Sequence, residues 1–161
     1  MNLEKEKWLT VAEYLSNLGR DLKIKSSLKV KDFMRYHPEF LTAKDSIRSA
    51  VEIMVNNSID AVPIVDEAGD LQGIVTKTLV LREILNGIDL QQPISQIMIS
   101  QVNSIGPEED VSNLIAINVG NLPVLRDQTV VGMVTLSDTI RAYFSSLIAL
   151  HAELNAVINS T

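Results

Sequence analysis

Residues 61–65 read Ala-Val-Pro-Ile-Val and residues 73–76 read Gly-Ile-Val-Thr, with the polar turn Asp-Glu-Ala-Gly-Asp at 66–70 between them. Two short runs rich in Val and Ile that flank a polar, glycine-containing turn predict two strands joined as a hairpin. The same signals return in the same order as Asn-Leu-Pro-Val-Leu at 121–125 and Gly-Met-Val-Thr at 132–135. The hairpin therefore belongs to an internal repeat, and this repeat organises the chain.

The repeat also has a shared opening upstream of each hairpin. Val-Lys-Asp-Phe-Met at 30–34 matches Ile-Ser-Gln-Ile-Met at 94–98. The second copy is four residues shorter between its opening and its hairpin, which corresponds to about one helical turn. We therefore expect the first helix of the second copy to be short. One further residue is lost in the turn at 126–129, which has no glycine.

Helical signals surround the first hairpin. Five apolar residues that begin at Ile47 follow the spacing i, i+3, i+4, i+7 and i+8, which predicts a helix with one buried face and with Asp45 or Ser46 as its N-cap. A second helix is expected over 78–85, where Asn-Gly at 86–87 would end it. Each copy is thus predicted to run strand, helix, strand, strand, helix. The apolar stripe consists of Ile47, Ala50, Val51, Met54 and Val55.

The two copies resemble the CBS domain family, whose domains occur in pairs of about this length and spacing. The resemblance covers roughly residues 30–147, and Gly-Met-Val-Thr-Leu-Ser-Asp at 132–138 is its most specific part. It implies an α/β (α+β) fold in which the two repeats pack through their sheets as a pseudo-twofold pair. The expected domains are an N-terminal amphipathic helix and linker at 1–29, a first CBS domain at 30–87, a second at 94–147 and an extended linker helix at 148–161.

The resemblance also implies a ligand. Paired CBS domains bind adenosine-containing ligands such as AMP, ADP, ATP or S-adenosylmethionine in clefts between the repeats, and a Gly-x-x-Thr-x-x-Asp pattern binds the ribose hydroxyls. The second copy keeps this pattern at Thr135 and Asp138, whereas Leu79 stands three residues after Thr76 in the first copy. One competent cleft and one degenerate cleft are therefore expected. The competent cleft would contain Met133, Thr135, Ser137, Asp138, Arg141, His37, Pro38, Glu39, Ile59, Asp60 and Ala61, and the degenerate cleft Thr76, Gly120, Asn121 and Leu122.

Other interpretations of these side chains stay open. Ser137 and Asp138 stand at the opening of a helix, where either side chain would also be favoured as an acceptor for unpaired backbone N–H groups. A histidine such as His37, which precedes a proline in a polar connection, is more often a loop residue than a ligand. Arg141 favours a phosphate group in the cleft, whereas Glu39 and Asp60 disfavour it, so the number of phosphates is left open.

Composition argues against several classes of function. A net charge of −6 supplies no broad basic surface, so we expect no direct contact with nucleic acid. The chain has no cysteine and only two histidines, and we expect no metal site and no required cofactor. No carboxylate pair or nucleophile motif stands out, which argues against an enzyme. No apolar run approaches the ~20 residues of a membrane span, and no signal peptide is recognised, so a cytoplasmic location is expected.

Both ends of the chain carry further helical patterns. Apolar residues from Trp8 to Leu18 predict an amphipathic helix over about 3–18, which would pack on its own domain or form a dimer contact. Near the C-terminus, apolar residues with heptad spacing favour a homodimer, although a single helix folded back onto the module also fits. These residues are Tyr143, Leu147, Leu150, Leu154 and Val157.

The final residues, 153–161, are similar to the helix that opens PAS domains in bacterial transcriptional regulators that depend on an alternative sigma factor. The chain is accordingly expected to be the N-terminal sensor part of such a regulator, with a PAS domain following. The leading hypothesis is a regulatory module that binds an adenosine-type ligand and transmits its presence to an attached domain. The alternative is a dimerisation scaffold without a small-molecule ligand, which Leu79 and the lost helical turn favour.

Overall fold

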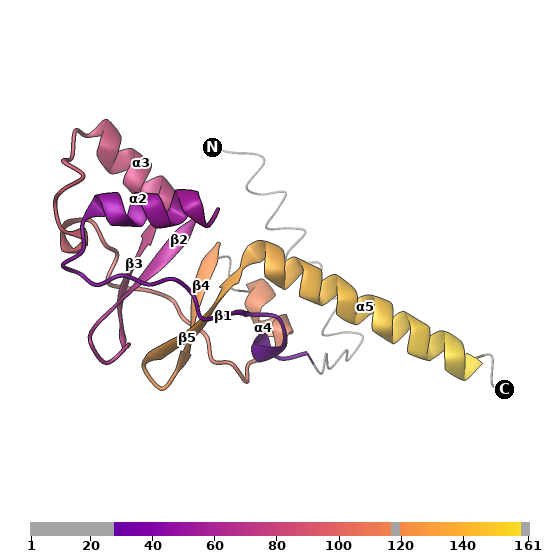
Figure 1. Ribbon diagram of the computed structural model, residues 1–161. Coiled ribbons are helices and arrows are strands. Elements are labelled where there is room, and N and C mark those ends of the chain that lie inside the picture. The colour runs from indigo at the N-terminus through magenta and orange to yellow at the C-terminus, as the bar shows by residue number, and fades with distance from the viewer. Residues whose placement is uncertain (1–27, 117–119, 159–161) are drawn as a thin grey trace. The chain divides into compact units, whose positions relative to one another are not determined.

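The computed structural model describes residues 28–116 and 120–158 (Figure 1). The chain divides into two compact units that both contain parts of each repeat. We call Arg35–Gly106 with Asn121–Val134 the sheet unit. The other, the helix unit, is described over residues 28–34, 107–116, 120 and 135–158. The helix predicted over 3–18 lies outside the described residues.

The first predicted helix is confirmed as α2, Ile47–Asn56. Its N-cap is Ser46, whose Oγ accepts a hydrogen bond from the backbone N–H of Ser49 at 3.2 Å. The predicted stripe is correct for Ile47 and Met54 but wrong for Val55, which is 69% exposed. Each step of four residues turns the helix by about 40° beyond a full turn, so the end of the stripe rotates away from the core.

The hairpin of the first copy is confirmed as β2, Ala61–Val65, and β3, Leu71–Thr76, which pair antiparallel. α3, Lys77–Leu85, follows β3 directly. It ends where the sequence indicates, because Gly87 has φ +83°, a left-handed conformation that glycine adopts without strain.

The core of the sheet unit lies around β2, where all five residues are buried. α2 contributes one side of this core, and the opening of the second copy contributes another. The two copies thus share buried residues within the same unit. The cluster consists of Ile47, Ala50, Met54, Val62, Ile64, Val75, Val80, Ile94 and Ile97.

The first strand of each copy is much reduced compared with the prediction. The openings form short 3₁₀ helices, η1 at Val30–Asp32 and η2 at Ile94–Gln96. Extended pairing appears further along, where Leu41 forms a parallel bridge with Ile64 and Ile105 forms one with Val124. These two bridges occupy equivalent places in the two copies, so the repeat is reproduced in the backbone even where the strands are short.

Each copy also pairs with the hairpin of the other within the sheet unit. β1, Arg35–Tyr36, pairs antiparallel with β5, Thr129–Thr135, which in turn pairs with β4, Asn121–Arg126. The equivalent pairing in the opposite direction joins Ile99 to Ile74 through two hydrogen bonds of 2.9 and 3.0 Å. This reciprocal exchange agrees with the expected pseudo-twofold relation between the copies.

The helix unit contains α4, Val111–Ala116, and α5, Leu136–Ile158. α4 is described as far as Ala116, and residues 117–119 lie outside the described residues, so the expected short helix stays a prediction. Figure 1 shows α4 beside the first half of α5. Their contact includes Val111, Ala142 and Tyr143, with Leu28, Phe33 and Leu147 packed against them.

The burial of Tyr143 corrects one detail of the heptad prediction. Tyr143 is only 6% exposed and packs against Val111, so it serves the core of its own unit and not a coiled-coil partner. This part of the helix fits the alternative in which it folds back onto the module.

Within residues 28–116 and 120–158, none of the helices combines the length and the apolar character that a membrane span requires.

Candidate functional site

The candidate ribose-binding pair lies at the start of α5, where the chain passes from β5 into the helix. Thr135 Oγ1 accepts a hydrogen bond from the backbone N–H of Asp138 at 3.1 Å and donates its own proton to Asp138 Oδ2 at 2.6 Å. Asp138 Oδ2 also accepts a hydrogen bond from the backbone N–H of Thr135 at 3.1 Å. This reciprocal arrangement is a capping box, which orders the first turn of a helix.

These hydrogen bonds assign a separate role to each residue in the cap of α5. Thr135 caps the helix through its hydroxyl, and Asp138 returns a hydrogen bond to Thr135. The residue expected to accept the unpaired N–H groups of the helix was Ser137 or Asp138, but Thr135 fills this role and Asp138 supports it from the first turn. This supporting role is compatible with a ligand contact because a carboxylate accepts several hydrogen bonds. Asp138 is half-buried, and its Oδ2 is oriented by two donors before any ligand arrives.

The first copy has only half of this arrangement. Thr76 Oγ1 accepts a hydrogen bond from the backbone N–H of Leu79 at 3.2 Å, as Thr135 does for Asp138. Leu79 returns none from its side chain, and it is instead 6% exposed in the core. The two copies therefore share the helix cap and differ in the carboxylate.

The residues that flank the two caps share a backbone hydrogen bond but differ in side-chain charge. Lys77 N–H donates to the carbonyl of Asp60 at 2.8 Å, and in the second copy Leu136 N–H donates to the carbonyl of Gly120 at 3.1 Å. Only the first copy adds an ion pair, between Lys77 Nζ and Asp60 Oδ1. The second copy has no side-chain charge at either of these two positions.

Lys77 is a charged neighbour of the predicted site residue Asp60 that sequence reasoning missed. Asp60 was expected to add negative charge, but the ion pair with Lys77 offsets it. Hairpin register would have indicated the partner, since Ala61 pairs with Thr76 and the next residues outward are Asp60 and Lys77. Both side chains are at least half exposed, so the pair contributes at most ~1 kcal/mol to stability.

The other predicted site residues are divided between the two units. Ser137 and Arg141 lie on α5 with Asp138 and are exposed. Met133 and Ala61 are brought together in the sheet unit, where both are buried in a cluster with Ile74. His37 is exposed, has φ +51° and lies with its ring centroid 6.5 Å from that of Tyr36. The contribution of His37, Pro38, Glu39, Ile59 and Asp60 to a ligand site stays a prediction.

The residues predicted for the degenerate cleft belong to different elements. Asn121 and Leu122 begin β4 in the sheet unit, while Thr76 is the N-cap of α3. Within residues 28–116 and 120–158, no group of three or more His, Asp or Glu side chains is arranged to hold a metal ion.

Comparison with known proteins agrees with this repeat structure. The CBS domain family model matches residues 30–86 and 94–145. The CBS domain-containing protein YhcV of Bacillus subtilis strain 168 is 32% identical over 114 residues, which cover 68% of this chain and 81% of YhcV.

Solved structures show the same similarity. The crystal structure of AcuB from Vibrio cholerae superposes with a TM-score of 0.70 at 27% identity, covering 78% of this chain and 98% of AcuB. The CBS domain pair of protein MJ0100, solved in complex with 5′-methylthioadenosine and S-adenosyl-L-methionine, superposes with a TM-score of 0.67 at 29% identity. That comparison covers 73% of this chain and 97% of the MJ0100 chain. The chain therefore belongs to the CBS domain family and contains a tandem pair of these domains.

Proposed function

We propose that this CBS pair is a regulatory module that binds one adenosine-containing ligand per chain, with Asp138 as the acceptor for the ribose hydroxyls. The observation that carries the proposal is the difference between the two caps. Asp138 is held by Thr135 in the second copy, whereas the buried Leu79 occupies the equivalent position in the first. A fixed carboxylate is suited to vicinal hydroxyls because both can donate to it, and leucine offers no acceptor.

The bound state of a relative supports the class of ligand. The MJ0100 pair was solved with 5′-methylthioadenosine and S-adenosyl-L-methionine, and both contain adenosine. AMP, ADP, ATP and S-adenosylmethionine are therefore the ligands to test. The exposed Arg141, one helical turn after Asp138, would favour those that carry phosphate.

The output of the module is proposed to pass along α5. This helix begins at the candidate ribose site and continues through Ile158, so a change in its first turn would be carried by one continuous element. A ligand shifts such a helix only through its differential affinity for two arrangements. An attached transcriptional effector domain and a homodimer are part of this proposal, and catalysis by the chain is not.

A thermal-shift experiment with the four ligands tests the proposal. At a ligand concentration of about 100 times the dissociation constant, binding stabilises the folded chain by about 2.7 kcal/mol. We expect at least one ligand to raise the midpoint of unfolding, and we expect Asp138→Ala to lose this increase. The ligand-free variant should also be about 1 kcal/mol less stable, because the capping box is broken.

Ser46→Ala provides the matched control for that loss of stability. It removes the cap of α2, where Ser46 accepts a hydrogen bond from Ser49, and should cost a similar ~1 kcal/mol. The ligand-induced increase should remain in this variant. An unchanged increase in Asp138→Ala would leave Asp138 with a capping role alone, and no increase in the wild type with any ligand would favour the scaffold function.

A further inference from the structure

Each unit contains a short clasp in which the opening of one copy pairs with the segment that leads into the first helix of the other copy. In the helix unit, Lys29 forms an antiparallel bridge with Asp110. In the sheet unit, Pro93 forms the equivalent bridge with Ser46. The two clasps therefore occupy corresponding places in the repeat. We call residues 28–31 with 107–111 the helix-unit clasp, and residues 92–95 with 43–47 the sheet-unit clasp.

Three backbone hydrogen bonds recur in the two clasps. Val30 N–H donates to the carbonyl of Glu109 at 2.9 Å, and Ile94 N–H donates to the carbonyl of Asp45 at 2.8 Å. Both donor residues have no exposed surface. The backbone alone therefore gives the two clasps matching hydrogen bonds. The other donor–acceptor pairs are Lys31–Pro107 and Val111–Leu28 in the helix unit, and Ser95–Ala43 and Ile47–Gln92 in the sheet unit.

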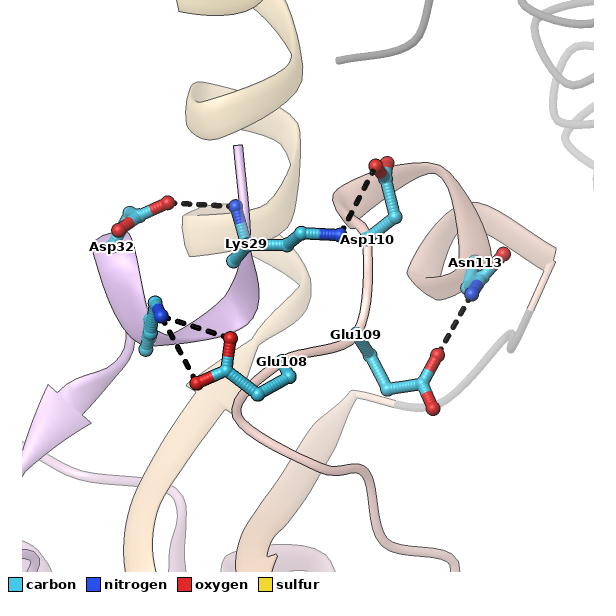
Figure 2. A network of polar contacts seen from close by, with 7 residues as sticks. Lys29, Asp32, Glu108, Glu109, Asp110 and Asn113 are labelled. Carbon is cyan, nitrogen blue, oxygen red and sulfur yellow. Dashed lines mark hydrogen bonds and ion pairs between the residues drawn. The ribbon is translucent and has the colours of Figure 1, made fainter. Parts of the chain in front are cut away.

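The side chains of the two clasps differ in charge. Figure 2 shows Lys29 pointing toward Asp110 in the helix-unit clasp, with Glu108 on the same loop before α4. Lys31 Nζ donates to both carboxylate oxygens of Glu108 at 2.8 and 2.9 Å, and Lys29 Nζ lies 4.0 Å from Asp110 Oδ2. In the sheet-unit clasp a proline and a serine take the places of the two lysines, so neither position can form an ion pair.

The helix-unit clasp ends at the residue that packs on α5. Val111, the first residue of α4, has no exposed surface and contacts Ala142 and Tyr143. Its N–H donates to the carbonyl of Leu28 at 3.2 Å, and the side chain of Leu28 packs against the same cluster. Opening of the clasp would therefore weaken the contact that holds the middle of α5 to its own unit.

We propose that the helix-unit clasp is an electrostatic latch on α5. Its ion pairs keep α4 against α5, and screening or removal of these charges loosens this contact while the sheet unit stays folded. The side chains of the two pairs are 24% to 68% exposed, so the pairs are weak and respond to salt. A weak latch shifts a local opening equilibrium without unfolding the whole protein. The inference does not depend on the proposed ligand, because it rests on the difference between the two clasps.

Hydrogen–deuterium exchange of the full chain, followed by mass spectrometry at two salt concentrations, tests the latch. Raising sodium chloride from about 0.05 to about 0.5 M should accelerate exchange in α4 and in the part of α5 around Ala142 by about two- to five-fold, because the ion pairs are screened. α2 begins at the sheet-unit clasp and is the internal control, whose exchange should change by less than about two-fold. No acceleration in α4, equal acceleration in α2, or acceleration in α4 without α5 would each contradict the proposal.

Glu108→Gln separates the ion pair from the general effects of salt. It removes the charge of the side chain and should accelerate exchange in α4 and α5 by about two- to five-fold at low salt. The charge-swapped variant, Lys31→Glu with Glu108→Lys, should restore slow exchange. Lys77→Gln is the matched control, because it removes an ion pair of similar exposure in the sheet unit and should leave α4 and α5 unchanged. The proposal is overturned if Glu108→Gln has no effect, if Lys77→Gln has an equal effect, or if the swapped pair does not restore slow exchange.

Discussion

Ile64→Ala is expected to lower the free energy of unfolding by about 3 kcal/mol, because it opens a cavity in the core of the sheet unit. Ile64 has no exposed surface and lies in β2, where every residue is buried. Ile64 is paired on both sides, with Leu41 in a parallel bridge and with Gly73 in the antiparallel hairpin. Such a site has little freedom to collapse around the missing atoms.

Chemical denaturation followed by circular dichroism measures this loss. Val55→Ala is the control, since it also shortens a branched apolar side chain in the sheet unit but at a position that is 69% exposed. The control should change stability by no more than about 0.5 kcal/mol. Equal unfolding midpoints for the two variants would contradict the burial of β2.

Gly73→Ala should be the second large effect, because the chain has no room for a side chain at this position. A Cβ atom on Gly73 would lie 2.9 Å from the carbonyl oxygen of Ile99 and 3.2 Å from Met98 Sδ. The oxygen belongs to the backbone that pairs with Ile74, so relief of the clash would disturb both hydrogen bonds of that pairing. We expect a loss of about 2 kcal/mol in the free energy of unfolding.

Gly120→Ala makes the same chemical change at a position where no atom of the described residues lies within 4 Å of the added Cβ. Since alanine reduces the conformational freedom of the unfolded chain, this control should be neutral or stabilising by up to ~1 kcal/mol. Both variants are compared by their unfolding midpoints in denaturant. Similar stabilities for Gly73→Ala and Gly120→Ala would show that the backbone of Ile99 does not approach β3 closely.

Local features of this fold were predictable from the sequence. The helix that begins at Ile47 and the helix end before Gly87 depend on neighbouring residues, and both were confirmed. The predicted burial of Val55 was wrong because residues spaced four apart rotate gradually around the helix, so the last of them leaves the buried face. The extended residues Leu41 and Ile105 were not foreseen as strand pairs, since an isolated bridge has no periodic pattern.

Contacts between segments that are distant in the sequence were harder to predict. The pairing of Tyr36 with Gly132 and of Ile99 with Ile74 depends on how the two copies exchange strands, and no short motif encodes it. At the candidate site, the motif located Thr135 and Asp138. Their reciprocal hydrogen bonds could not be read from it, because Ser137 and Asp138 also fitted the role of N-cap.

The asymmetry between Asp138 and Leu79 is the central claim, and the stoichiometry of ligand binding tests it most directly. Isothermal titration calorimetry of the full chain with the ligand that gives the largest thermal shift should yield one site per chain. Asp138→Ala should abolish that site. Two equivalent sites per chain, or one site that is unaffected by Asp138→Ala, would contradict the assignment of the ribose to the second copy.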